Sequence, residues 1–352
     1  MINLSKFVVF SSFLLWTACL SKTNSAYTQS AQVAAIGFYN LENLFDTEDD
    51  PAILDEEFTP GGPKLWTEDK YRDKLQRLSS VISDFGKDFT ADGVAILGVC
   101  EIENKRVLED LVQSEKLKNK NYQIIHFNSK DPRGIDVALL YQSKYFTPIE
   151  SKSITLNFLE SDNSIRRSRD LLFVKGMLGD QLIFVTVNHW PSRRGGQQLT
   201  DPYRIQAAKF SKHLADSVLA IHPDAHFIVM GDLNDNPNNV SMVKGLQAKQ
   251  HKDKLKKNEF YNPYYNNFIR GDGTTAYQDS WSLFDQIIFS ENLLKAQKKK
   301  YYFYKHTIYK KDYMIEMEGH FKNYPKRTFS GDIYNFGYSD HFPVLIYLVR
   351  EI

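Results

Sequence analysis

Apolar runs separated by polar, turn-forming stretches predict a chain of buried strands with only a few helices between them. The clearest runs combine β-branched or aromatic residues with no charge, which is typical of strands buried on both faces. They cover residues 33–39, 93–100, 182–188 and 227–230. Further strands are predicted over residues 122–127, 133–141, 171–177 and 283–289, with a last one ending near Val349. Gly179 and Asp180 fit the turn of a hairpin between two of these runs.

Helical periodicity is restricted to a few segments. Thr67 is placed to cap a helix whose first turn is acidic, as the helix dipole favours. The apolar positions of this helix recur at helical spacing and predict one buried face. Asp201 and Pro202 predict the N-cap and first turn of a second helix, and residues 105–117 suggest a short third one. Many strands with two or three helices predict one domain of the α/β (α+β) sandwich class.

The N-terminus has the pattern of an export signal. Lys6 precedes an apolar run over residues 7–19 that is too short to span a bilayer comfortably and fits the core of a signal peptide. Thr17-Ala18-Cys19 resembles a bacterial lipobox, in which Cys19 becomes the lipidated first residue, although Trp16 stands where that pattern prefers leucine. Ordinary cleavage after Ala26 is the alternative.

This interpretation divides the chain into a signal peptide over residues 1–19, a tether over 20–32 and a folded domain over 33–352. We expect an exported protein, either a membrane-anchored lipoprotein or one released into the periplasm or the medium. Cys100 is then the one cysteine of the folded domain, so the fold must hold without an intramolecular disulfide.

The charge balance limits the partners that the whole molecule can attract. Lys and Arg number 44 and Asp and Glu number 43 in 352 residues, so the protein is not a polycation. Any contact with nucleic acid must therefore use a local basic patch.

The run 227–230 is followed by several short side chains that carry oxygen. Gly231 stops the run, and Asp232, Asn234, Asp235 and Asn236 follow it. Because side chains alternate along an extended chain, Asp232 and Asn234 point to the same side, where they could activate and orient a water. An Asx-rich turn after a core strand is the alternative for this stretch taken alone.

Other predicted strands deliver matching chemistry, which favours an active site over a turn. Two further acids stand inside apolar runs and need a partner there. The full set is Asn40, Glu101, Asp136, His189, Asp232, Asn234, Asp285, Asp340 and His341. Carboxylates with an amide make a hard oxygen site suited to Mg²⁺, Mn²⁺ or Ca²⁺ rather than zinc. Histidines beside such a metal suit phosphate chemistry.

These motifs resemble, in content and order, those of the endonuclease/exonuclease/phosphatase superfamily, which includes deoxyribonuclease I. The resemblance covers essentially all of residues 33–350. It implies a four-layer αββα sandwich, deoxyribonuclease I-like, with the site where the strand ends of two sheets meet. It also implies a divalent metal, Mg²⁺ or Mn²⁺ with Ca²⁺ as a further candidate.

The resemblance implies a role for each matched residue. Glu101 would be the principal metal ligand, with Asn40 and Asp340 near it. Asp232 would activate the attacking water and Asn234 would orient it.

The two histidines would act on the phosphate. His341, oriented by Asp285, would hold an oxygen of the scissile phosphate. His189 would do the same from the other side or protonate the leaving oxygen. Asp136 stands where nucleases of the family place an acid paired with that histidine.

Two arginines follow His189 on a glycine-rich loop. Arg193 and Arg194 could grip a second phosphate, and a solvated loop is the equal alternative. Residues 295–330 mix lysines with aromatic residues. This pattern fits either an exposed hairpin or loop, or a surface that contacts the substrate.

We expect an exported, metal-dependent phosphodiesterase that acts as a monomer, most simply a nuclease, and among nucleases an endonuclease, hydrolysing DNA or RNA with an activated water. A phosphatase or a lipid phosphodiesterase on the same scaffold, acting on a phosphorylated small molecule or lipid, is the alternative. A non-catalytic binding lipoprotein would have lost acids or histidines of the set, and this chain has kept them.

Overall fold

The computed structural model describes residues 31–160 and 162–352. The predicted signal peptide, its lipobox at Cys19 and all but the end of the predicted tether lie outside the described residues. Within the part that is described, no helix combines the length and the apolar character needed to cross a membrane.

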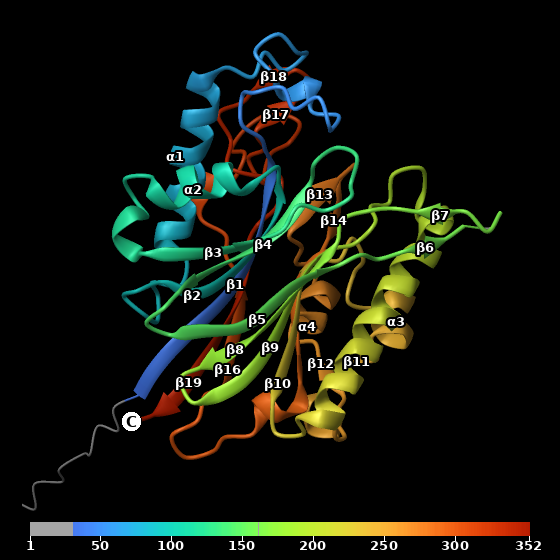
Figure 1. The fold of residues 1–352 in the computed structure, drawn as a ribbon. Helices are drawn as coiled ribbons and strands as arrows, with labels where there is room; N and C mark the ends of the chain where they lie inside the picture. The colour runs from blue at the N-terminus through green and yellow to red at the C-terminus, as the bar shows by residue number, and fades with distance from the viewer. Residues whose placement is uncertain (1–30, 161) are drawn as a thin grey trace, which may run out of the picture.

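Two mixed β-sheets form the centre of the molecule (Figure 1). Among the described residues, the first sheet has six strands in the order β16-β19-β1-β2-β4-β3. Their bounds are β1 Ala31–Leu44, β2 Val94–Ile102, β3 Tyr122–His126, β4 Asp136–Gln142, β16 Tyr302–Ile308 and β19 Val344–Glu351. β1 runs parallel to β2 and antiparallel to β19, so the first and last strands of the described chain lie side by side.

The second sheet has the order β11-β12-β15-β10-β9-β8-β5. Its strands are β5 Phe146–Ile154, β8 Leu171–Leu178, β9 Gln181–His189, β10 His226–Asp232, β11 Ala248–Lys249, β12 Phe260–Tyr261 and β15 Asp285–Ser290. β9 and β10 are parallel neighbours, and the hairpin predicted at Gly179 and Asp180 joins β8 to β9.

Helices and three small hairpins complete the chain. The α-helices are α1 Glu68–Asp84, α2 Lys105–Gln113, α3 Gln197–Ile221 and α4 Tyr265–Ile269, and a π-helical turn covers Ser241–Gly245. Short 3-10 helices cover Glu56–Phe58, Lys118–Lys120, Lys252–Lys254, Glu291–Leu294 and Asp312–Met314. The hairpins pair β6 Phe158–Leu159 with β7 Ile165–Arg166, β13 Thr275–Tyr277 with β14 Ser280–Ser282, and β17 Phe329–Ser330 with β18 Ile333–Tyr334.

Three buried clusters show that the layers are stacked as helix, sheet, sheet, helix. Alternate residues of β1 point to opposite faces: Tyr39 packs with α1 and α2, whereas Phe38 packs in the cluster between the two sheets. On the far side, Phe227 of β10 packs against α3 through Ala215 and Leu219. The predicted four-layer sandwich is therefore confirmed.

The start of α3 differs from the prediction. The helix begins at Gln197 and not after an N-cap at Asp201, so Pro202 lies inside it. The side chain of Asp201 pairs with Arg204 and is not used as a cap. Thr200 accounts for part of the difference, since its backbone N–H and its hydroxyl both bond to the carbonyl of Gly196 and close the earlier turn.

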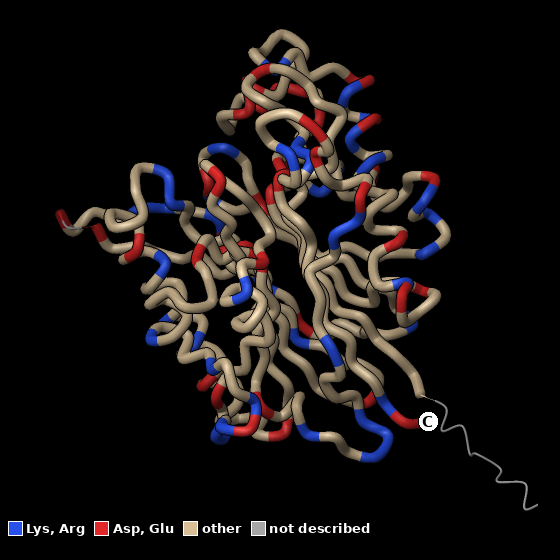
Figure 2. The backbone as a smooth tube through the Cα atoms, turned by 180° about the vertical axis from the view of Figure 1, so that it is seen from behind, with Lys and Arg blue, Asp and Glu red and all other residues tan. Residues whose placement is uncertain are grey.

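In Figure 2, basic and acidic residues are interspersed over the periphery of the described chain, and the central strands carry few of them. This matches the near-neutral composition.

Candidate active site

The carboxyl ends of parallel strands bring the predicted residues to one edge of the sandwich. Glu101 lies near the end of β2, and His189 and Asp232 are the last residues of the parallel neighbours β9 and β10. In the sheet register, Asp232 stands directly between His189 on one side and Asp285, the first residue of β15, on the other. His341 reaches the same edge from the loop before β19.

Asn40 links the two sheets at this edge. Its Nδ2 donates to Glu101 Oε1 at 3.0 Å and to Asp232 Oδ2 at 3.1 Å. Its Oδ1 accepts the backbone N–H of Glu42 at 2.9 Å. Because a backbone N–H can only donate, this bond fixes the orientation of the amide. Asn40 therefore aligns the two carboxylates and does not point its oxygen at a metal, contrary to the prediction that it is a ligand.

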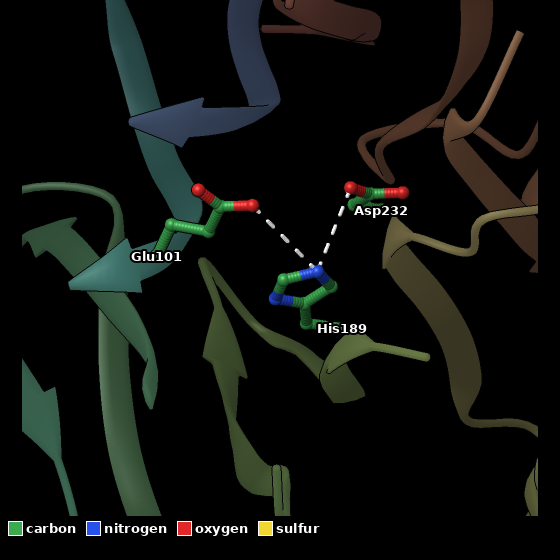
Figure 3. A group of neighbouring side chains, drawn as sticks. All are labelled: Glu101, His189 and Asp232. Atoms are coloured by element: carbon green, nitrogen blue, oxygen red, sulfur yellow. Dashed lines mark ion pairs between the residues drawn. The ribbon is translucent and has the colours of Figure 1, made fainter. Parts of the chain in front are cut away.

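Glu101, His189 and Asp232 converge in a way that could hold a divalent cation (Figure 3). One ligand atom from each lies within 4.8 Å of the others. His189 Nε2 is 3.8 Å from Glu101 Oε1 and 3.7 Å from Asp232 Oδ2. Two carboxylates linked by a neutral amide leave a local excess of negative charge, so these residues fit the divalent metal that the sequence predicts.

Asp340 is engaged differently from the prediction. Its Oδ2 accepts from Arg327 Nη2 at 2.9 Å, and its side chain stays about one-quarter exposed. In the described residues, two groups of side chains could hold a metal: Glu101, His189 and Asp232, and Asp232, Asp285 and His341. Asp340 belongs to neither. One carboxylate oxygen of Asp340 is already paired with Arg327. To bind a metal through this oxygen, Asp340 would have to release Arg327.

His341 and Asp285 form a buried pair on the other side of Asp232. His341 Nδ1 lies 2.7 Å from Asp285 Oδ2, and Nε2 lies 3.9 Å from Asp232 Oδ2. Burial lowers the pKa of His341, but the carboxylates of Asp285 and Asp232 outweigh it and raise the pKa well above its ordinary value. The imidazole is therefore held in its cationic form, which suits contact with an anion.

Asp232 is buried among these charges. Burial raises the pKa of its carboxyl to about 7, and Asp285 and Glu101 add to the rise while His341 opposes it. Asp232 Oδ1 accepts the backbone N–H of Asn234 at 3.0 Å. A carboxylate with a pKa near neutrality can take a proton from water more readily than an ordinary one.

Backbone strain is concentrated around these side chains. Glu42, Asn43, Glu101 and Asn234 all adopt positive φ, between 48° and 57°. For residues other than glycine this conformation is unfavourable, and it persists where the surroundings enforce it. The strained turns re-aim side chains at the ends of β1, β2 and β10.

Asn234 is held close to Asp232 by its turn. Its Nδ2 donates to the carbonyl of Trp190 at 3.0 Å, so the amide bridges the ends of β9 and β10. One amide N–H and the amide oxygen remain to orient a water or a phosphate, as predicted for this residue.

The predicted pair of Asp136 with His189 is wrong. Asp136 Oδ2 instead lies 2.8 Å from Nε2 of His126, on the neighbouring strand β3, and its Oδ1 accepts the backbone N–H of Ser129. Asp136 starts β4, which pairs directly with β3, so His126 is the nearer imidazole. Within the described residues, His189 Nδ1 has no hydrogen-bond partner.

His189 lies close to cationic side chains as well as to Glu101 and Asp232. Burial lowers its pKa well below the ordinary value, and the charges of Arg169, Arg133 and His341 lower it further. The two histidines of the site therefore differ: His189 is held neutral, whereas His341 is held cationic.

Arg193 is engaged by the protein and does not face a free phosphate site. Its Nε donates to the carbonyl of Asn234 at 2.9 Å, and its Nη2 donates to Asp235 and Asn239 at 3.0 Å each. Its guanidinium also stacks on the ring of Phe284 at 4.7 Å. Arg193 thus stabilises the turn that carries Asn234, which corrects its prediction as a substrate ligand.

Two arginines near the site were not predicted from the sequence. Arg169 is buried and donates to the carbonyl of Trp190 at 2.6 Å, directly behind His189. Arg327 pairs with Asp340. Neither stands in an apolar run or at a predicted strand end, so no pattern in the sequence distinguished them. Arg194, which was predicted, keeps an exposed side chain.

Comparison with known proteins decides the family. The model of the endonuclease/exonuclease/phosphatase family matches residues 35–350. The chain belongs to the endonuclease/exonuclease/phosphatase family. Membership supports hydrolysis of a phosphoric ester and use of a divalent metal, at the level of the family. Among curated proteins, no significant match was found.

Solved structures of this family share the fold. A family protein from Bacteroides thetaiotaomicron is 14% identical, covers 92% of this chain and 98% of its own, and has a TM-score of 0.51. TDP2 from D. rerio, complexed with a single-strand DNA product, is 13% identical with coverages of 90% and 98% and a TM-score of 0.53. Truncated TDP2 from Caenorhabditis elegans is 16% identical with coverages of 90% and 97% and a TM-score of 0.50.

Proposed function

We propose that the protein is a metal-dependent phosphodiesterase that cuts nucleic acid, DNA or RNA, with an activated water. The observation that carries the proposal is the placement of Asp232 between a neutral and a cationic histidine, next to Glu101. A base, a phosphate-binding cation and a metal-binding acid are the groups that this hydrolysis needs. The single-strand DNA product bound to the structural neighbour from D. rerio favours a nucleic-acid substrate.

Each residue then has a role that its contacts support. Asp232 takes the proton of the attacking water, and Asn234 orients that water. His341, held cationic by Asp285, binds a non-bridging oxygen of the phosphate. Glu101, next to Asp232, would hold a Mg²⁺ or Mn²⁺ ion, which would supply charge stabilisation for the phosphate oxygens.

His189 supports the reaction from the opposite side of the phosphate. In its Nε2–H tautomer, the neutral imidazole can donate a hydrogen bond to a phosphate oxygen. It can pass a proton to the leaving oxygen only after it has itself been protonated. Asn40 keeps Glu101 and Asp232 aligned.

The test compares Asp232→Asn with wild type on a single-stranded oligonucleotide and on bis(p-nitrophenyl) phosphate, with Mg²⁺ or Mn²⁺ present. Loss of a general base lowers the rate on the order of 10²- to 10⁴-fold. Circular dichroism checks that the near-isosteric variant is folded. Wild-type rates in Asp232→Asn on both substrates would show that the proposal is wrong.

A lipid phosphodiester is the second candidate, because the β6–β7 hairpin exposes Leu159 by 58% and Ile165 by 60%. An exposed apolar hairpin is a feature of lipid-binding surfaces. However, charged residues of both signs, Glu160, Asp162, Arg166 and Arg167, lie between or beside these two apolar side chains and interrupt the apolar surface of the hairpin. Sphingomyelin vesicles and inositol phosphates belong in the same substrate panel, and turnover of either in preference to the oligonucleotide favours this alternative.

Export remains part of the proposal. It rests on the signal-like residues 1–19, with lipidation at Cys19 as the anchor. Labelling with a radioactive fatty acid in a bacterial host, compared with a Cys19→Ala variant, tests the anchor.

A further inference from the structure

The loops around the candidate site carry opposite charges on its two sides. The loop between β1 and α1 leaves the site on the side of the first sheet, just after Asn40. The β6–β7 hairpin and the loop after His189 leave it on the side of the second sheet. In Figure 1 the first of these loops lies above the sheets beside β17 and β18, whereas the hairpin projects on the opposite side above α3.

The loop on the first side is strongly acidic. Residues 45–63 contain no lysine or arginine. They contain seven acids: Asp46, Glu48, Asp49, Asp50, Asp55, Glu56 and Glu57. All but Asp46 and Asp55 are exposed. Asp46 ties the loop to the site, since its backbone N–H donates to Glu103 Oε2 at 2.7 Å, two residues after Glu101.

The other side presents arginines. Arg166 stacks on Tyr203 at 5.1 Å, lies 3.7 Å from Glu160 and still keeps about half of its side chain exposed. Arg167 and Arg194 are exposed, and no acid pairs with either in the described part of the chain. Arg169 connects this group to the site, because it joins the base of the hairpin to the carbonyl of Trp190.

We propose that a nucleic-acid strand runs from the site over the flank formed by Arg166, Arg167 and Arg194, that the acidic loop 45–63 excludes it from the other flank, and that the enzyme therefore acts at strand ends. The proposal rests on the proposed function and adds to it the direction of the substrate. A polyanion gains affinity from each phosphate that an arginine neutralises. It is repelled by a run of carboxylates within the Debye length of about 10 Å at 0.1 M salt.

One-sided binding has a consequence for the products. An enzyme that holds a strand on both sides of the scissile bond can cut in the middle of it. An enzyme that binds the strand on only one side of the scissile bond offers no favourable surface to the part of the strand that continues on the other side. A circular strand always continues past both sides and must cross the acidic loop.

The experiment uses a linear and a circular single-stranded DNA of the same sequence, with the purified wild-type enzyme and Mg²⁺ or Mn²⁺. We expect the linear strand to be shortened from one end, as labels on the two ends reveal, while the circle is cut at least tenfold more slowly. Equal rates on the circle and the linear strand would overturn the proposal.

Neutralising the acidic loop gives the sharper test. Asp49 and Glu56 are exposed, and no ion pair involves either in the described residues. Asp49→Asn with Glu56→Gln should raise the rate on the circle relative to the linear strand. The matched control is Asp180→Asn with Asp224→Asn, which removes two exposed acids at the opposite edge of the second sheet. A rise in the control as large as in the loop variant, or no rise in either, contradicts the proposal.

The arginine flank is tested by salt dependence. Arg167→Gln with Arg194→Gln should reduce kcat/KM for the linear strand more than for bis(p-nitrophenyl) phosphate. The steepness of log kcat/KM against log salt should fall by about 1.4 for two lost phosphate contacts on a single strand. An unchanged slope overturns the role of this flank. Failure of the proposed function itself would give a different result. In that case the wild-type enzyme would cleave neither bis(p-nitrophenyl) phosphate nor either DNA, or Asp232→Asn would cleave them as fast as wild type.

Discussion

Single contacts determine the protonation state of each of the two histidines in this site. The two imidazoles face the same carboxylate, yet His341 is hydrogen-bonded to an acid, whereas His189 approaches Asp232 and Glu101 only to 3.7 and 3.8 Å. A buried carboxylate raises the pKa of a neighbouring imidazole, whereas desolvation alone lowers it. One contact, from Asp285, therefore accounts for most of the difference between the two histidines.

Asp285→Asn should remove this difference. Without the carboxylate, burial dominates and the pKa of His341 falls, so the imidazole loses its proton at a lower pH. We expect kcat for bis(p-nitrophenyl) phosphate to drop on the order of 10²- to 10⁴-fold near neutral pH. The remaining activity should decline as the pH rises through a range where wild type is constant.

The same change affects stability with a defined sign. A histidine whose pKa is raised in the folded state contributes stability below its ordinary pKa, and this contribution is lost as the pH rises through the raised value. Asp285→Asn should therefore destabilise most at acidic and neutral pH. An unchanged pH–rate profile would contradict the assigned role of Asp285.

Residue identity was predictable from the sequence, but residue pairing was only partly so. Alternation and strand ends indicated Glu101 and Asp232, because polar residues after buried runs stand out, whereas the role of His341 came from the family resemblance. The pairing of Asp136 with His126 depends on which strands are neighbours, and the periodicity of a strand carries no information on its neighbours. The orientation of the Asn40 amide likewise depends on the N–H of Glu42, which adopts a strained backbone conformation.

At the scale of secondary-structure elements, the close approach of β9 and β10 positions His189 and Asp232. Gly231 precedes Asp232, and a Cβ at this position would lie 2.2 Å from the backbone oxygen of Asn188 on β9. A backbone atom cannot move aside without separating the strands. Both His189 and Asp232 are the next residues along these two strands, so their separation depends on this glycine.

Gly231→Ala should therefore lower both stability and activity. We expect a destabilisation of about 1–3 kcal/mol, typical of overpacking, measured by urea unfolding. Gly98→Ala should cost less, because the nearest atom, Met230 Sδ at 2.5 Å, belongs to a flexible side chain. Gly61→Ala is the control, since no atom lies within 4 Å of its added Cβ. A Gly231→Ala protein as stable and active as Gly61→Ala would contradict this account.

Element boundaries show the same limit of sequence reasoning. The apolar runs predicted the strands that bear the site because burial on both faces leaves a continuous signature. The start of α3 was misplaced because Asp201 and Pro202 imitate a helix start, while the bonds of Thr200 to Gly196 close an earlier turn.

At the scale of the whole molecule, the candidate metal site couples chemistry to stability. Folding brings Glu101 and Asp232 together with a neutral amide between them, and the repulsion of two carboxylates opposes folding. A divalent cation that binds only the folded protein offsets this cost. A metal present at 100 times its dissociation constant adds about 2.7 kcal/mol to the free energy of unfolding.

Thermal unfolding in EDTA and in increasing Mg²⁺ or Mn²⁺ should reveal this coupling without any substrate. We expect the Tm of wild type to rise by a few degrees as the metal saturates. Glu101→Gln should abolish the rise, because it removes the principal carboxylate ligand of the cation. Glu109→Gln, which changes an exposed acid on α2, should respond to metal as wild type does. A full metal response in Glu101→Gln would place the cation elsewhere on the protein and separate it from the chemistry assigned to this edge of the sheets.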